Sequence, residues 1–331
     1  MNAIYSYTAA AGTSPGALKQ LWAQSGTGLA SGCTSLVPIQ IGGKSILFTF
    51  NKATQKLDAY VLSAKAPWIR QTRCKADLSK APGGKTNAWD MINAFVLGNI
   101  PYLVAYRADT GQFGYYSISD DLSLSPPYIF SSSHTTPSAG FTTVAPYTSL
   151  SGQYLLGYDY NTGRVENFSV AVVPGSTTGA PPLLALNVWF HQWAKYWTHF
   201  SFFQLGGSTF FFKINLDPKK PQLVNVNIDH MQDNPAMGGI EIGTNLQTQL
   251  PDAALIDAAA IIPWAYGEPY LLTYIASSGK TVVYKIHADC LGWTQETSIV
   301  TVKGAALAAP YRIGDTSYVL LYQGSAKKTS Q

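Results

Sequence analysis

Hydrophobic and polar residues alternate along this chain in a unit that recurs six times. Each unit has an apolar run ending in an aromatic or β-branched residue, a short polar turn, and a second apolar run. Runs of this length and composition, bounded by turn residues, predict β-hairpins. The hairpins are expected at 45–62, 101–118, 153–170, 209–228 and 269–286, and a sixth is expected to join 317–323 to 2–8.

A further strand is expected before each hairpin, and a weaker one after most of them. The preceding strands are predicted at 35–43, 91–99, 142–150, 199–207, 260–268 and 307–315. Four of these contain proline. Proline lacks the N–H group that a strand paired on both sides needs, and it therefore indicates a strand at a sheet edge. The weaker strands are predicted at 18–22, 127–130, 184–190 and 292–298.

Four strands per unit, repeated every roughly 50 to 60 residues, are typical of a β-propeller. Over essentially its whole length the chain resembles a six-bladed β-propeller and is loosely similar to lectin-like propellers. The fold is therefore expected to be all-β, with four-stranded antiparallel blades and a last blade closed by the N- and C-terminal strands. Residues 1–331 are expected to form one domain. A seven-bladed ring and a pair of β-sandwiches are the alternatives.

Composition narrows the classes of function. Of the 331 residues, 46% are hydrophobic and 12% charged, and the net charge is +4. A charge this small and scattered argues against a nucleic-acid partner. The three cysteines form no CxxC pair, which argues against a zinc site. No apolar run is long enough to span a membrane, and the first residues lack a secretory pattern. We expect a cytoplasmic protein, or one released without a classical signal peptide.

Candidate binding residues come from an aromatic segment, 187–200, and from two long stretches without clear strand patterning, 75–90 and 229–258. Long loops in a compact domain are often functional. Aromatic rings at the mouth of a funnel would stack on a sugar or an apolar small molecule. The alternative is an outer strand packed against the next blade. The predicted ligand-binding residues are Trp89, Trp193, Trp197, Trp264 and His191.

Acid–base residues are also present near the predicted inner strands. Asp90, His199 and Asp257 would approach one axis in a closed ring, and a carboxylate beside a histidine suits proton transfer. The alternative is that these three residues are polar side chains lining a wet channel. No cofactor motif is present.

A calcium site is a further hypothesis, because three hairpin turns carry acidic residues whose oxygen atoms suit this ion. These acidic residues are Asp109, Asp159 and Asp217. Ordinary turns carry acidic residues as well.

Three classes of function follow from these patterns. The first is a ligand-binding, lectin-like propeller with a small-molecule or glycan ligand at the funnel mouth. The second is an enzyme, either a hydrolase, a lyase or a cyclase, with acid–base residues in the central channel. The third is a protein-interaction scaffold, which the fold permits. The oligomeric state is not predicted.

Overall fold

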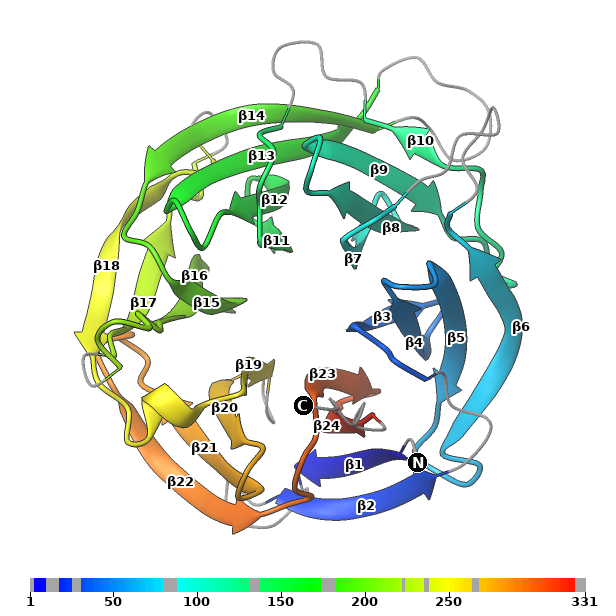
Figure 1. Ribbon diagram of the computed structural model, residues 1–331. Coiled ribbons are helices and arrows are strands. Elements are labelled where there is room, and N and C mark those ends of the chain that lie inside the picture. Colours follow the sequence, from blue (N-terminus) through cyan, green and yellow to red (C-terminus); the bar gives the residue numbers. More distant parts are fainter. Residues whose placement is uncertain are drawn as a thin grey trace. The chain divides into compact units, whose positions relative to one another are not determined.

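The computed structural model describes residues 3–9, 18–25, 31–79, 88–130, 137–173, 183–221, 224–234, 238–263 and 268–324. These residues form six antiparallel sheets of four strands each (Figure 1). The fold is an all-β, six-bladed β-propeller, which confirms the predicted fold class. The described residues also contain one short 3₁₀ turn, η1 (Ala253–Leu255). None of their helices is long and apolar enough to cross a membrane.

The chain divides into two compact units, each with three blades. The first unit comprises Met1–Leu78, Ile256–Ile286 and Thr294–Gln331. One of its blades contains β3 (Ser35–Ile41), β4 (Lys44–Asn51), β5 (Lys56–Leu62) and β6 (Ile69–Asp77). Another contains β19 (Ala258–Pro263), β20 (Pro269–Ile275), β21 (Lys280–Ile286) and β22 (Trp293–Val300).

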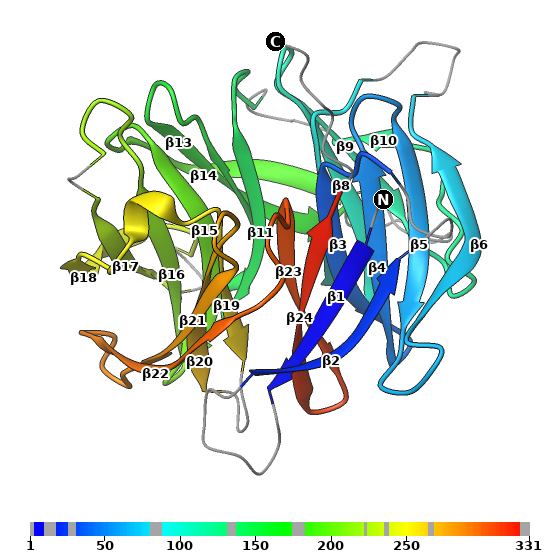
Figure 2. The same cartoon turned by 60° about the horizontal axis from the view of Figure 1, so that its bottom comes forward.

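The third blade of this unit is built from both ends of the described chain. It contains β1 (Ala3–Ala9), β2 (Leu18–Ser25), β23 (Leu307–Ile313) and β24 (Thr316–Gln323). Figure 2 shows β1 between β2 and β24. Tyr5 lies opposite Leu321 on one side and Ala23 on the other. The predicted closure of the last blade is therefore confirmed.

The second unit comprises Ser79–Leu255 and His287–Trp293. Its first blade contains β7 (Met91–Leu97), β8 (Ile100–Arg107), β9 (Gln112–Ser117) and β10 (Tyr128–Ile129). Its second contains β11 (Thr143–Ser149), β12 (Gly152–Tyr158), β13 (Arg164–Val172) and β14 (Leu183–Gln192). Its third contains β15 (Trp197–Leu205), β16 (Ser208–Asn215), β17 (Val226–Met231) and β18 (Glu241–Thr248).

The hydrophobic core of each unit lies between neighbouring blades. The middle strands are the most apolar, and every residue of β20 is buried. In the second unit, one cluster joins β7–β10 to β11–β14, and another joins β11–β14 to β15–β18. Prolines of the first strands stand at sheet edges, as predicted: Pro38 in β3, Pro146 in β11 and Pro310 in β23. Proline has no N–H group to donate, and at an edge no neighbouring strand is left without a hydrogen-bond donor.

Two segments differ from the predictions. The stretches 75–90 and 229–258 were expected to be long loops, yet the first begins inside β6 and the second contains the end of β17, all of β18 and η1. Both β6 and β18 are outer strands. Residues of β18 are mostly half-buried or exposed, so the strand lacks the apolar alternation by which strands are recognised.

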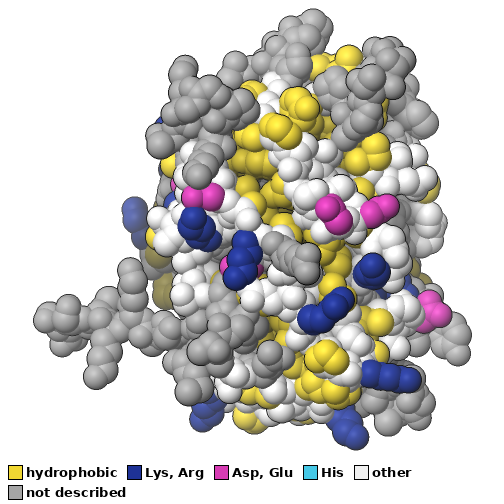
Figure 3. All heavy atoms as spheres, turned by 90° about the vertical axis from the view of Figure 1, so that its right-hand side faces the viewer, with side chains coloured by type: hydrophobic (Ala, Val, Ile, Leu, Met, Phe, Trp, Pro, Cys, Tyr) yellow, Lys and Arg dark blue, Asp and Glu magenta, His cyan; other side chains and the backbone are white. Residues whose placement is uncertain are grey.

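Figure 3 shows the charged side chains on one face of the molecule. Lysines and arginines are scattered over this face among hydrophobic and uncharged side chains, and some of them lie beside acidic side chains.

Candidate functional site: a buried lysine and two carboxyl groups

The candidate site lies in the β15–β18 blade and departs from the pattern of the other blades. Lys213 stands in the apolar run of β16, opposite Asn227 of β17. Asp229, two residues further along β17, lies opposite Phe211. Because side chains alternate across a strand, these four share one face of the sheet. Glu241 begins β18 opposite Met231.

The strand register allows the six blades to be compared position by position. The place of Lys213 is taken in the other blades by uncharged residues: Thr49, Ala105, Gly157, Thr273 and Leu321. The place of Asp229 is taken in all five by aromatic residues: Tyr60, Tyr116, Phe168, Tyr284 and Tyr7. One blade therefore has an ion pair where the other five have one uncharged, non-aromatic residue and one aromatic residue.

Lys213 is paired with two carboxyl groups inside the blade. Its Nζ atom forms an ion pair with Oδ2 of Asp229 and lies 3.6 Å from Oε1 of Glu241. The side chains of Lys213, Asp229 and Glu241 are 3%, 0% and 13% exposed. A buried ammonium is tolerated only when opposite charge is close, and Asp229 supplies it. Glu241 is the member of the group that reaches the surface.

Aromatic rings enclose the ammonium on its remaining sides. Nζ of Lys213 lies 3.8 Å from the ring centroid of Trp193, 4.6 Å from that of Trp197 and 5.2 Å from that of Phe211. Cation–π attraction therefore adds to the ion pair. The indole Nε1 of Trp193 also donates a 2.6 Å hydrogen bond to Oε2 of Glu241. Trp193 thus contacts both the cation and the exposed acid.

Burial, the largest cause, and the neighbouring Asp229 carboxylate together raise the pKa of Glu241 from 4.5 to about 7. Lys213 and the Trp193 indole act in the opposite direction but do not cancel the effect. A carboxyl group with a pKa near 7 carries a proton for part of the time at neutral pH. It can therefore give or take a proton, as acid–base catalysis requires.

The aromatic segment predicted from the sequence is part of this site. Trp189 and His191, at the end of β14, stack with centroids 5.7 Å apart, and Trp189 lies 6.0 Å from Trp193. His191 is exposed, whereas Trp189 and Trp193 are half-buried. Trp197 is buried in the core beneath them. The structure thus brings together three predicted residues, Trp193, Trp197 and His191, beside the ionic group.

Two of the predicted catalytic residues occupy equivalent places in different units. Asp90 accepts a 2.6 Å hydrogen bond from the backbone N–H of Ala108, and Asp257 accepts one of 2.6 Å from Ala276. The hydroxyl groups of Thr34 and Thr142 accept the same bond in two other blades. These side chains brace the hairpin turn of their blade. Their joint action in a channel stays a prediction.

The other predicted residues are placed as follows. His199 lies at a bulge in β15 with φ of 58°, and its Nδ1 lies 2.6 Å from Oγ1 of Thr198. Trp89 is fully buried, and its Nε1 donates a 2.9 Å hydrogen bond to the Tyr116 hydroxyl. A ligand could reach that ring only if the blade opened. Trp264 lies outside the described residues.

The acidic turns considered for calcium make local contacts instead of converging. Asp109 pairs with Arg107 at 2.6 Å, and Asp159 accepts a 2.6 Å hydrogen bond from the Thr162 hydroxyl. Asp217 accepts a 2.9 Å bond from the N–H of Lys219. Among the described residues, no group of three or more histidine, cysteine, aspartate or glutamate side chains is placed to hold a metal ion.

Reasoning from the sequence did not select Lys213, Asp229 or Glu241. Glu241 lay in the segment expected to be a loop, and Asp229 lay at its start. A signal was nevertheless present, because aligning the hairpin repeats places one lysine and one aspartate where the other units have uncharged and aromatic residues. A charge inside an apolar repeat requires a partner.

The comparisons with known proteins agree on the class of fold. Six four-stranded blades, with the last shared by both ends of the chain, define a six-bladed β-propeller. No protein-family description matches this chain, and no curated protein matches its sequence. Solved structures do resemble it.

An α-L-arabinanase from Penicillium chrysogenum, complexed with arabinobiose, has a TM-score of 0.54 at 8% identity, covering 88% of this chain and 93% of that one. A Bacteroides fragilis protein provisionally named 6-phosphogluconolactonase has a TM-score of 0.51 at 14% identity, covering 95% and 85%. A GH43 β-1,3-galactosidase has a TM-score of 0.51 at 6% identity, covering 82% and 95%. Identities this low establish the shared fold alone.

Proposed function

We propose that this propeller is a hydrolase acting on a sugar-derived substrate, with Glu241 as the residue that transfers the proton. The observation that carries the proposal is that one blade has Lys213 and Asp229, paired with the partly exposed Glu241, where the other blades have an uncharged and an aromatic residue. Five blades fold without these charges, so the fold itself does not require them.

The residues divide into a contacting group and a positioning group. Glu241 would contact the substrate, because it is the more exposed of the two carboxyl groups. Lys213 and Asp229 are positioning residues that act on the pKa of Glu241, which Lys213 lowers and Asp229 raises. Trp189 and His191 present stacked rings beside it. Such rings suit the apolar C–H face of a sugar.

The spacing of the carboxyl groups favours a lactone or ester over a glycoside. Glycosidases separate their two carboxyl groups by roughly 5 Å or more, to fit a sugar or a water molecule between them. Here Oδ2 of Asp229 forms an ion pair with Nζ of Lys213, Oε1 of Glu241 lies 3.6 Å from the same atom, and Asp229 is fully buried, so no sugar can lie between the two carboxyl groups. A carboxyl group with a pKa near 7 can instead deprotonate water for attack on a carbonyl carbon and then protonate the departing ring oxygen.

The named structural neighbours support a sugar-derived substrate. Among them are an arabinanase, a β-1,3-galactosidase and a protein provisionally named as a lactonase. The enzyme alternative stated for the sequence is thus better supported than the lectin-like one. The scaffold alternative receives no support from the cluster, since a docking surface needs no buried acid.

The test is hydrolysis of glucono-1,5-lactone and galactono-1,4-lactone at pH 6, followed by titration of the acid released. We expect the wild-type protein to exceed the buffer rate and Glu241→Gln to lose about a hundredfold or more of that excess, as removal of a general acid–base group does. Glu166→Gln is the matched control, because Glu166 is also buried in this unit but bonds to Ser138. No excess rate, or full activity in Glu241→Gln, refutes the proposal. Saturable lactone binding without turnover would favour the lectin-like alternative.

A further inference from the structure

A cavity lies in the same unit and shares no lining residue with the ionic group. It has a volume of about 190 Å³ and is located where the turn between β8 and β9, the end of β10 and the first residues of β14 meet. Its lining residues are all described: Thr110, Gln112, Phe113, Ile129, Phe130, Pro137 and Ala185.

The cavity exists because one outer strand is unusually short. β10 has 2 residues, whereas the outer strands β14 and β18 of the same unit have 10 and 8. β10 pairs with Tyr115 and Gly114, and the N–H of Phe130 donates one further bond to the carbonyl of Phe113. Among the described residues, β10 therefore does not extend beside the beginning of β9.

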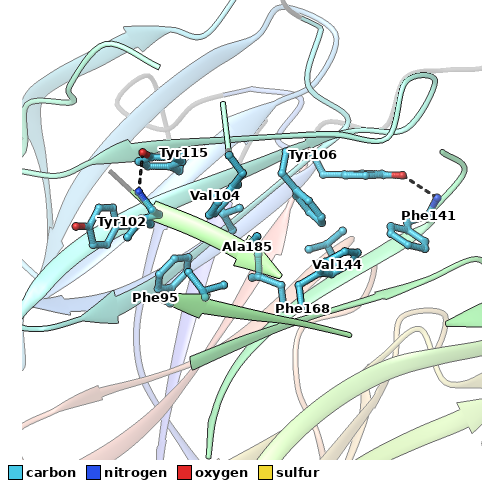
Figure 4. Packing of buried hydrophobic residues seen from close by; sticks show 14 residues of the cluster. Phe95, Tyr102, Val104, Tyr106, Tyr115, Phe141, Val144, Phe168 and Ala185 are labelled. Atoms are coloured by element: carbon cyan, nitrogen blue, oxygen red, sulfur yellow. Dashed lines mark hydrogen bonds between the residues drawn. The ribbon is translucent and has the colours of Figure 1, made fainter. Parts of the chain in front are cut away.

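The walls of the cavity are fixed by the core behind them. The rings of Phe113 and Phe130 meet edge to face with centroids 6.0 Å apart, and Phe113 meets Phe168 in the same way at 5.5 Å. Ala185 lies in the packed cluster that Figure 4 shows. The hydroxyl of Tyr115 accepts a 2.8 Å hydrogen bond from the N–H of Leu183, which holds the start of β14 in place. A preformed site of this kind binds without ordering its walls.

The chemistry of the lining selects one class of ligand. Two aromatic rings, a proline, an isoleucine and an alanine form most of the wall, and the polar side chains are those of Thr110 and Gln112. A cavity of about 150 Å³ with similar apolar walls accommodates benzene. A sugar would bury several hydroxyl groups against two polar side chains, which is unfavourable. We propose that this cavity binds a small monocyclic aromatic molecule carrying one hydrogen-bonding group.

The experiment uses phenol as the probe, with toluene and glucose as comparisons, and measures binding by titration calorimetry and ligand-observed NMR. Phenol is expected to bind saturably and toluene more weakly, while glucose at the same concentrations is expected to give no signal. Ala185→Leu fills the cavity and is expected to lower phenol affinity at least about tenfold. Gln112→Leu is expected to remove the preference for phenol over toluene.

Thr110→Val is a variant that is expected to fold normally, because Thr110 is exposed in a turn. Combined with Gln112→Leu, it leaves the cavity without polar side chains and is expected to make phenol and toluene bind alike. Failure of phenol to bind the wild-type protein overturns the proposal, as does equal phenol affinity in folded Ala185→Leu. Because Glu241 is not part of this lining, neither result depends on the hydrolase proposal.

Discussion

The sharpest prediction concerns the stability of Glu241→Gln as a function of pH. Glutamine is nearly the same shape as a protonated glutamate, and its oxygen can still accept the hydrogen bond that Trp193 donates to this position. The pKa of Glu241 is 4.5 ordinarily and about 7 in the fold, a difference of about 2.5 pH units that corresponds to roughly 3 kcal/mol. Between these two pH values the folded protein holds a proton that the unfolded chain has lost.

The sign of the effect follows from this difference. Because the folded state binds more protons, the free energy of unfolding of the wild-type protein falls as the pH rises from 4.5 through 7. Glutamine cannot ionise, so the variant escapes this loss. At pH 5 the variant is expected to be more stable by only roughly 1 kcal/mol, whereas at pH 8 it is expected to be more stable by roughly 3 kcal/mol.

Urea unfolding at pH 5 and pH 8, followed by tryptophan fluorescence and by circular dichroism, measures both free energies. The quantity to compare is the difference between the two proteins at each pH, because histidines and other carboxylates contribute equally to both and cancel. If Glu241→Gln is no more stable than the wild-type protein at pH 8, Glu241 does not hold a proton in the fold, and its role as the acid fails with it.

Three further predictions concern the scaffold and the ion pair. Asp90→Ala should lower the free energy of unfolding by about 1 to 3 kcal/mol, and Asp90→Asn should lower it less because it keeps an acceptor oxygen; a large loss of turnover in folded Asp90→Asn would instead support its predicted catalytic role. Lys213→Met should lose about 3 to 5 kcal/mol, whereas Lys213→Thr combined with Asp229→Tyr, which restores the residues of other blades, should be at least as stable as wild type; urea titration measures both. Deleting residues 1–9 should abolish cooperative thermal unfolding by circular dichroism, since β1 joins β2 to β24; a retained transition would contradict its bridging role.

Much of the fold could be predicted because the signal repeats. One apolar hairpin is ambiguous, but six of them at similar intervals fix the blade, and a strand at each end of the chain fixes the closure. The middle strands β4, β8 and β12 are almost wholly buried, so selection for hydrophobic residues is strong there. The prolines in β3 and β11 correctly indicated that these strands lie at sheet edges.

The outer strands could not be predicted equally well, for a physical reason. An outer strand packs against a neighbour on fewer sides than a middle strand, so more of its side chains are free to be polar, and β18 reads EIGTNLQT. Glu241 begins that strand and was therefore missed. Trp89 shows the opposite case, a residue predicted to bind a ligand that fills the core instead. The sequence around an aromatic residue near a blade's first strand looks the same in both situations.

The departures of the β15–β18 blade from its neighbours occur together. Trp197 occupies the position at which Asp90, Thr142 and Asp257 brace their hairpins, and its ring covers the Lys213 ammonium instead. The next turn of chain is a bulge, with Tyr196 and His199 at positive φ. Bulges and left-handed non-glycine residues cost free energy and gather near functional sites. A buried ion pair likewise adds little net stability over well-packed uncharged residues of similar volume. Stability alone therefore does not account for a strained bulge and an ion pair within one blade, and their coincidence singles out this blade for the tests of proton transfer.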